Sequence, residues 1–223
     1  MKQITFYFDF ISPYAYLAFE QLLSALQGLS YSVDYKPLLF AGLLKYHGQL
    51  GPAEIRPKRD WTYRQVLWLA QRHDIAMQMP AKHPFNPLAL LRLALACGQQ
   101  AGSAGPRPGK VNRFVCETIF RHVWRGGADA ADPQRFDALR QGLAPAGDPA
   151  GELVKAELKA NTEEAVALDL FGVPSLVVDG KVFWGVDALP MLREYLEGTA
   201  WFASGDWERA ALLPAGIQRS GRH

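Results

Sequence analysis

The sequence predicts an α/β fold in which a helical block interrupts a small sheet. Apolar and polar residues alternate near both ends of the 223-residue chain, as they do in strands. Between these ends, apolar residues recur at three- and four-residue spacing, which is typical of helices. Apolar residues make up 49% of the chain and charged residues 21%, which is the usage of an ordinary folded domain.

The chain begins with a strand that is followed directly by a helix. Every second residue of this strand is apolar: Ile4, Phe6, Phe8 and Phe10. Ser12 is a favoured N-cap and Pro13 a favoured first helical residue, so a helix is expected from here to Gly28. Residues 31–36 alternate again and complete a β-α-β unit, whose two strands should be parallel.

The middle of the chain is predicted to be entirely helical. Helical spacing of apolar residues marks five segments: 61–73, 87–99, 111–125, 133–142 and 149–159. Stretches without periodicity, rich in Gly with Pro or Asp, are expected to be loops: 102–109 and 126–133. Asn161, which precedes Thr162 and two acidic residues, carries an N-cap signal and predicts a new helix that runs to Leu170.

A hairpin and a closing helix follow. Two short segments are expected to be strands: 175–178 and 181–184. The Asp179-Gly180 pair between them supplies the positive φ angles that a two-residue turn requires. Residues 187–196 are predicted to form a helix that ends at Gly198.

The order of these elements is that of a thioredoxin-like fold with an all-helical insertion. Residues 1–40 and 161–198 are predicted to form the thioredoxin-like core, and residues 41–160 the insertion. Residues 199–223 have no clear period and are expected to form a tail that packs partly on the body and frays from about Pro214.

Composition and spacing argue against several classes of protein. A net charge of +2 without a basic block argues against a nucleic-acid partner. The chain shows no secretory signal and no apolar stretch of membrane-spanning length, so a cytoplasmic protein without membrane contact is expected. Cys97 and Cys116 are far apart and lie in helical patterns, which predicts buried thiols and no redox pair. No metal site is predicted, because the histidines lack metal-ligand spacing.

The turn at Ser12 is the first place where the sequence indicates chemistry. A helix N-terminus favours negative charge, so a thiolate placed there is stabilised. The chain has no cysteine at this turn, so a reacting thiol must come from a ligand, and the Ser12 hydroxyl can donate a hydrogen bond to its sulfur. The alternative is that Ser12 only caps the helix.

The second place is the Val173-Pro174 pair before the hairpin. A proline that enters a strand after a helix stop is a candidate for a cis peptide bond, which leaves the backbone of Val173 free to pair with an extended ligand. The alternative is an edge-strand proline that only prevents aggregation.

Three motifs in this order resemble a known family. They are Ser-Pro-Tyr after the first strand, Phe-Gly-Val-Pro before the hairpin and Phe-Trp-Gly-Val-Asp after it, at 12–14, 171–174 and 183–187. Together they resemble the 2-hydroxychromene-2-carboxylate isomerases and the kappa-class glutathione transferases, relatives of DsbA-type oxidoreductases. The resemblance extends to about Gly198 and includes residues 83–87 and 121–124 in the helical block.

The resemblance implies glutathione as cofactor. It implies that Ser12 activates the glutathione thiol, that Val173 with Pro174 holds the cysteinyl backbone, and that the γ-glutamyl end binds at Val186 and Asp187. The loop before the first insertion helix provides an Asn and a Lys to glutathione in the family. Gln49 stands at the Asn position, with a longer side chain, and Lys58 matches the Lys.

A second, apolar substrate needs further residues. The candidates in the helical block are Trp61, Phe85, Asn86 and Trp124. The alternative for the aromatic residues is an ordinary core position, and for Asn86 a helix cap.

The function implied by the resemblance is that of a glutathione-dependent isomerase. It would act on an aromatic-pathway 2-oxo acid, a small aromatic carboxylate, by reversible thiolate addition, in a homodimer. The first alternative is a kappa-class-like glutathione transferase, and the second is a non-catalytic glutathione- or peptide-binding module. A DsbA-like disulfide oxidoreductase would need a cysteine pair that the Ser12 turn lacks.

Overall fold

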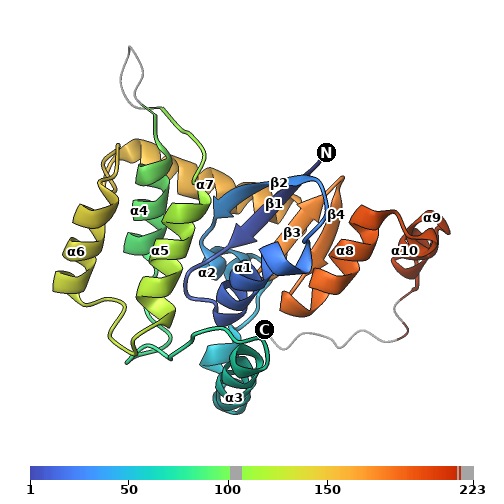
Figure 1. Cartoon of the computed structure of the whole chain (residues 1–223), viewed down its shortest axis with the longest axis horizontal. Coiled ribbons are helices and arrows are strands. Elements are labelled where there is room, and N and C mark those ends of the chain that lie inside the picture. The colour runs from blue at the N-terminus through green and yellow to red at the C-terminus, as the bar shows by residue number, and fades with distance from the viewer. Residues whose placement is uncertain (101–106, 215, 217–223) are drawn as a thin grey trace.

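A mixed four-stranded sheet forms the centre of the molecule (Figure 1). The structure, a computed structural model, describes residues 1–100, 107–214 and 216. Four strands lie in the order β2-β1-β3-β4: β1 (Lys2–Phe8), β2 (Tyr31–Pro37), β3 (Ser175–Val178) and β4 (Lys181–Trp184). β1 and β2 are parallel with Lys2 opposite Tyr31, which confirms the predicted β-α-β unit, and β3 and β4 join antiparallel to them.

Successive side chains of β1 point to opposite faces of the sheet and belong to two separate hydrophobic cores. Phe6 and Phe8 are fully buried in the larger core, with α1 (Pro13–Ala25) and α8 (Leu189–Glu197). Tyr7 points to the other face, in a smaller core with α2 (Phe40–Tyr46) and α7 (Glu152–Ala167). Helices therefore cover both faces of the sheet, as in other α/β folds.

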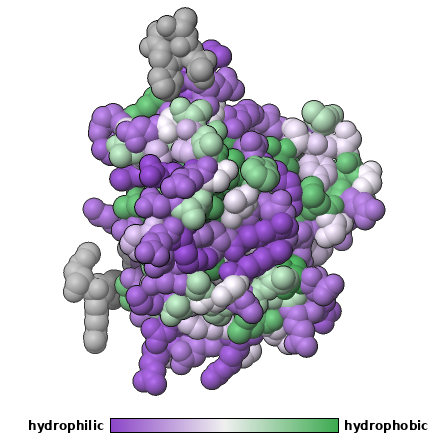
Figure 2. All heavy atoms as spheres, turned by 60° about the vertical axis from the view of Figure 1, so that its left-hand side comes forward, coloured by the Kyte–Doolittle hydropathy of each residue, from purple (hydrophilic) through white to green (hydrophobic). Residues whose placement is uncertain are grey.

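The helical insertion lies at one end of the sheet. It contains α3 (Arg56–Arg72), α4 (Leu88–Gly98), α5 (Arg113–Trp124) and α6 (Pro133–Leu143), together with a short 3-10 turn, η1 (Pro52–Glu54). Phe120 of α5 packs against Phe10 of the β1–α1 turn, with ring centroids 4.8 Å apart. The side of the molecule on which α6 lies is mostly hydrophilic with scattered apolar areas (Figure 1 and Figure 2).

One predicted helix start is wrong. α7 continues through Asn161 from Glu152 to Ala167, so residues 149–159 and 161–170 do not form two helices. The Asn161 amide donates to the carbonyl of Pro37 at 3.0 Å, and the Thr162 hydroxyl oxygen accepts from the Leu39 amide at 3.1 Å. These polar side chains bind the end of β2 and the residues just after it instead of capping their own helix. The division at 160/161 therefore falls inside one helix.

The hairpin turn has the predicted backbone. Asp179 and Gly180 have φ of 48° and 77°, as the Asp-Gly pair indicates. The closing helix starts later than predicted, at Leu189, because Asp187 lies in a preceding 3-10 turn, η2 (Val186–Ala188). Gly198 ends this helix in the left-handed conformation.

The tail contains two short helices that the sequence pattern did not indicate, α9 (Ala200–Ala203) and α10 (Asp206–Ala210). Phe202 and Trp207 pack on Phe183 of β4 at centroid distances of 6.2 and 5.4 Å, so the tail packs on the body as predicted. The predicted fraying after Pro214 lies almost wholly outside the described residues. No helix of the described part of the chain is long and apolar enough to cross a membrane.

Candidate functional site

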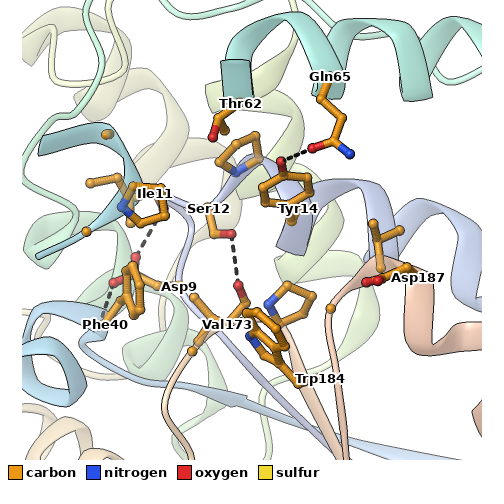
Figure 3. A pocket seen from close by; sticks show the side chains of 18 of the residues that line it. Asp9, Ile11, Ser12, Tyr14, Phe40, Thr62, Gln65, Val173, Trp184 and Asp187 are labelled. Atoms are coloured by element: carbon orange, nitrogen blue, oxygen red, sulfur yellow. Dashed lines mark hydrogen bonds between the residues drawn. The ribbon is translucent and has the colours of Figure 1, made fainter. Parts of the chain in front are cut away.

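A pocket of about 1550 Å³ opens where β1 ends and α1 begins. Its walls come from the β1–α1 turn, the segment from α2 to α3, the loop before β3 and the start of α8 (Figure 3). Small-molecule sites usually measure about 300–1,000 Å³. The pocket therefore has room for a tripeptide and a second small molecule together.

Ser12 lies in the pocket wall at the N-terminus of α1. Its side-chain oxygen accepts a hydrogen bond from the amide of Ala15 at 3.2 Å, so Ser12 is the N-cap, as predicted. The same hydroxyl donates to the carbonyl of Val173 at 3.3 Å. With only 7% of the residue exposed, the hydroxyl has a fixed place beside the positive end of the helix dipole.

The segment before β3 completes this side of the pocket. The Val173-Pro174 peptide bond is cis, as the sequence predicted. Both residues line the pocket, and Val173 presents its carbonyl to Ser12. Gly172 allows Trp184 to approach, because a Cβ atom on Gly172 would lie only 2.5 Å from the indole nitrogen.

Asp9 is a buried carboxyl beside the same turn (Figure 3). Its two oxygens accept from the amides of Ile11 at 3.1 Å and Phe40 at 2.9 Å. Complete burial raises the pKa of Asp9 to about 7, although the backbone hydrogen bonds oppose this rise. Asp9 therefore links the Ser12 turn to the start of α2 and titrates near neutral pH.

Most of the predicted site residues do line this pocket. Besides Ser12, Val173 and Pro174, the structure brings six of them there: Gln49, Lys58, Trp61, Phe85, Val186 and Asp187. The side chains of Lys58 and Asp187 are exposed, with opposite charges available to a zwitterionic ligand. Segments far apart in the sequence therefore meet around Ser12.

Two predicted substrate residues do not line the pocket. Trp124 is completely buried, stacks on Tyr16 and donates from its indole nitrogen to the carbonyl of Phe10 at 3.0 Å, so its predicted substrate contact is wrong. Asn86 is not a lining residue either. Its side chain accepts from the amide of Leu88, the first residue of α4, at 3.0 Å, although the N-cap of α4 is Pro87 and not Asn86.

Sequence reasoning missed an aromatic pair at the pocket entrance. Phe171 and Trp184 both line the pocket, are 42% and 52% exposed, and have ring centroids 4.8 Å apart. Both belong to the motifs quoted for the resemblance, but alternation alone does not say that residue 184 faces a pocket. Exposed aromatic rings at a pocket favour contact with a flat, apolar ligand.

Tyr14 and His83 were also missed as lining residues. Tyr14 is one position into α1 and donates its hydroxyl to Gln65 at 2.6 Å, which ties α1 to α3. Burial raises the pKa of Tyr14 and keeps the phenol neutral. The Ser-Pro-Tyr spacing was the available signal for Tyr14, whereas the approach of His83 depends on the path of the helical block.

The protein's own thiols lie elsewhere. Cys97 and Cys116 are free and are not among the lining residues that the structure describes. Burial raises the pKa of Cys97 to about 11 and that of Cys116 further. Within the described ranges, no cluster of three or more His, Cys, Asp or Glu side chains is placed to hold a metal ion. At the Ser12 turn, a hydroxyl lies at a helix N-terminus, a combination that stabilises an anion.

The fold and this turn define a class of protein. Residues 3–197 match the model of the DsbA-like thioredoxin domain, so the chain belongs to that family. This confirms the predicted thioredoxin-like fold with a helical insertion.

Individual relatives agree with the resemblance found in the motifs. The chain is 27% identical to a 2-hydroxychromene-2-carboxylate isomerase of Sphingobium xenophagum over 202 residues, 87% of this chain and 98% of the relative. It is 26% identical to glutathione S-transferase kappa 1 of Rattus norvegicus over 212 residues, 90% and 92% of the two chains. A solved structure of a 2-hydroxychromene-2-carboxylate isomerase superposes with a TM-score of 0.69 at 21% identity, covering 95% of this chain and all of that one.

Proposed function

We propose that the protein is a glutathione-dependent isomerase that acts on an aromatic-pathway 2-oxo acid. The observation that carries the proposal is the Ser12 hydroxyl, held at the N-terminus of α1 and beside the Val173 carbonyl, in a large pocket without a lining cysteine among the described residues. The similarity to isomerases and kappa-class transferases supports it.

The pocket has groups suited to each part of glutathione. The backbone of Val173, which lines the pocket beside Ser12 and precedes Pro174, would pair with the cysteinyl residue. Asp187 can pair with the γ-glutamyl ammonium beside the backbone of Val186. Lys58 can pair with a carboxylate of the tripeptide, and Gln49 can donate its amide. This set of donors, acceptors and charges fits a zwitterionic tripeptide.

Ser12 would hold the thiol in its ionised form. When bound, glutathione supplies a nucleophilic thiolate that adds reversibly to the unsaturated substrate. The Ser12 hydroxyl would turn from the Val173 carbonyl to donate to the sulfur, while its oxygen continues to accept from the Ala15 amide. The helix dipole acts in the same direction, so the pKa of the bound thiol is expected to fall.

The second substrate would lie against the aromatic rings of the pocket. Trp61 and Phe85 come from the helical insertion, and Phe171 and Trp184 from the core side. Their apolar faces suit a flat aromatic carboxylate, for which the pocket volume leaves room beside glutathione.

A glutathione titration tests the proposal. Purified protein is titrated with glutathione, and ultraviolet absorbance near the thiolate band shows whether the bound thiol is ionised at pH 7. We expect binding with ionisation, and Ser12→Ala should abolish the ionisation. If wild-type protein binds no glutathione, or if Ser12→Ala keeps full glutathione-dependent turnover, the proposed role is wrong.

A kappa-class-like glutathione transferase is the second candidate. The 26% identity to glutathione S-transferase kappa 1 over nearly the whole length favours it. Product analysis distinguishes the two, because isomerisation consumes no glutathione and conjugation does. Constant total glutathione during turnover supports the isomerase, and stoichiometric loss supports the transferase.

The assembly and location belong to the same proposal. We propose a homodimer, as the resemblance implies, and the cytoplasmic location that the sequence predicts. Light scattering after size-exclusion chromatography should give twice the chain mass, and a monomer mass would contradict it.

A further inference from the structure

The turn that carries Ser12 is held by two side chains of the helical insertion. The indole nitrogen of Trp124 donates to the carbonyl of Phe10 at 3.0 Å. The imidazole of His83 lies with Nε2 2.8 Å from the carbonyl of Ile11. These carbonyls belong to the two residues directly before Ser12, so both bonds act on one short segment.

Neither carbonyl lies within a regular element. β1 ends at Phe8 and α1 begins at Pro13, so residues 10 and 11 fall between the strand ladder and the helix. Buried carbonyls in such a place need partners from elsewhere. Here the partners come from positions 83 and 124, far along the chain in the insertion.

The contact with Ile11 fixes one nitrogen of His83 as a donor. A carbonyl oxygen only accepts, so Nε2 carries the hydrogen that is directed at Ile11. The hydroxyl of Tyr63 on α3 lies 2.8 Å from both Nδ1 and the His83 carbonyl, and its single hydrogen is shared between these two acceptors when the ring is neutral. Burial lowers the pKa of His83, which favours the neutral ring. A chain of hydrogen bonds thus runs from Tyr63 on α3 through His83 to the Ser12 turn.

The ring of Trp124 is held in place by burial and by stacking on Tyr16. Its ring is completely buried and lies nearly parallel to Tyr16, with ring centroids 6.3 Å apart and planes inclined by 17°. The His83 ring lies 5.5 Å from the Trp124 ring, so the two donors support each other. Their positions are therefore coupled through direct packing.

We propose that His83 and Trp124 are positioning residues that fix the Ser12 turn and thereby aim the Ser12 hydroxyl at the thiol of bound glutathione. The proposal rests on the proposed function. It gives the helical insertion a second role besides forming a wall of the pocket, because the insertion sets the geometry of the core's own reacting group.

A purely structural role for the two bonds predicts a different result. Loss of a structural hydrogen bond lowers stability but leaves the bound thiol ionised. Loss of positioning raises the pKa of the bound thiol, because the Ser12 hydroxyl no longer lies where the sulfur binds. Ionisation at saturating glutathione therefore separates the two roles.

The test uses four variants of the full chain. His83→Phe and Trp124→Phe keep an aromatic ring and remove the donors, whereas His83→Gln keeps a donor at the reach of Nε2. Tyr16→Phe is the matched control, because the Tyr16 hydroxyl donates to the carbonyl of Ala76 at 2.6 Å in the same aromatic cluster without touching the turn. Circular dichroism and urea unfolding establish that each variant is folded.

At saturating glutathione and pH 7, His83→Phe and Trp124→Phe should lower the ratio of thiolate to thiol by about fivefold to tenfold. His83→Gln and Tyr16→Phe should stay near the wild-type value. Folded His83→Phe and Trp124→Phe proteins with wild-type ionisation would overturn the proposal.

Amide hydrogen exchange over residues 10–16 without glutathione gives an independent readout. The two Phe variants at positions 83 and 124 should exchange faster there than Tyr16→Phe. If wild-type protein binds no glutathione, the proposed function fails, and the exchange rates alone then decide whether His83 and Trp124 fix the Ser12 turn. Unchanged exchange in both variants would overturn that positioning role.

Discussion

At the scale of single residues, Ser12 combines two hydrogen-bonding roles. Its oxygen caps α1 by accepting from the Ala15 amide, and its hydrogen is directed at the Val173 carbonyl. Only the first role is local, so only the cap could be derived from the Ser-Pro pair itself. The second role depends on a residue 161 positions away in the chain.

The two roles can be separated with a second cap as the control. Ser12→Ala should lower the free energy of unfolding by about 1 kcal/mol and abolish ionisation of bound glutathione. Asn112→Ala removes the side chain that accepts from the Val115 amide at the start of α5, and should cost about as much stability without changing ionisation. Urea unfolding and thiolate absorbance measure the two effects. Equal ionisation in both variants would contradict a special role for Ser12.

Asp9 should make stability depend on pH. Burial raises its folded pKa to about 7 from an ordinary value of 3.8, so the folded chain binds more protons than the unfolded chain between these values. Its contribution is fully present below about pH 4 and is lost as the pH rises through about 7, a fall of up to about 4 kcal/mol.

The variant Asp9→Asn, which does not titrate, should remove that part of the slope. Urea unfolding at several pH values between 5 and 8 gives the free energy of unfolding of each protein. The comparison concerns the slopes and not the absolute values, because the amide also alters the hydrogen bonds to Ile11 and Phe40. Parallel slopes in the two proteins would show that Asp9 does not titrate in this range.

At the scale of elements, short-range signals are reliable where the backbone itself is constrained. The Asp179-Gly180 turn and the Ser12-Pro13 helix start were predicted correctly because both depend on neighbouring residues. The N-cap signal at Asn161 was wrong because its amide donates instead to the carbonyl of Pro37 at the end of β2. The hydrogen bond to Pro37 therefore explains why Asn161, a residue type that favours helix starts, lies inside a helix.

The hairpin turn gives a test at this scale. Gly180 has φ of 77° and open space where a Cβ atom would lie, so Gly180→Ala should destabilise the protein by about 1–2 kcal/mol through backbone strain alone. Gly142 in α6 has equally open space, and Gly142→Ala should stabilise it by up to about 1 kcal/mol. Urea unfolding measures both changes, and the same sign for both would contradict the assigned conformations.

At the scale of the whole molecule, packing decides which thiols can react. Both cysteines of the chain lie in the helical insertion, Cys97 on α4 and Cys116 on α5. Burial raises the pKa of both, so the protein's own sulfur is kept largely as the inert thiol. A thiolate at the Ser12 turn must therefore come from a ligand.

Alkylation measures this directly. At pH 8, a pKa of about 11 leaves about one thousandth of Cys97 as thiolate, so native protein should react with iodoacetamide far more slowly than urea-unfolded protein. Mass spectrometry over time follows the modification, and insulin reduction should be absent. Rapid alkylation of the native chain together with insulin reduction would revive the disulfide oxidoreductase alternative.

The sequence by itself determined most of the elements and the helix cap at Ser12, because alternation, helical spacing and the Ser-Pro and Asp-Gly pairs act through adjacent residues. Family resemblance supplied Asp187 and Lys58, which the fold brings to one pocket with Val173. The tertiary structure alone decided that Trp124 supports the turn instead of binding substrate. It also decided that His83 approaches Ile11 and that Asp9 is buried with no counter-charge from the described residues in hydrogen-bond contact, because burial and hydrogen bonding between distant segments leave no periodic trace in the sequence.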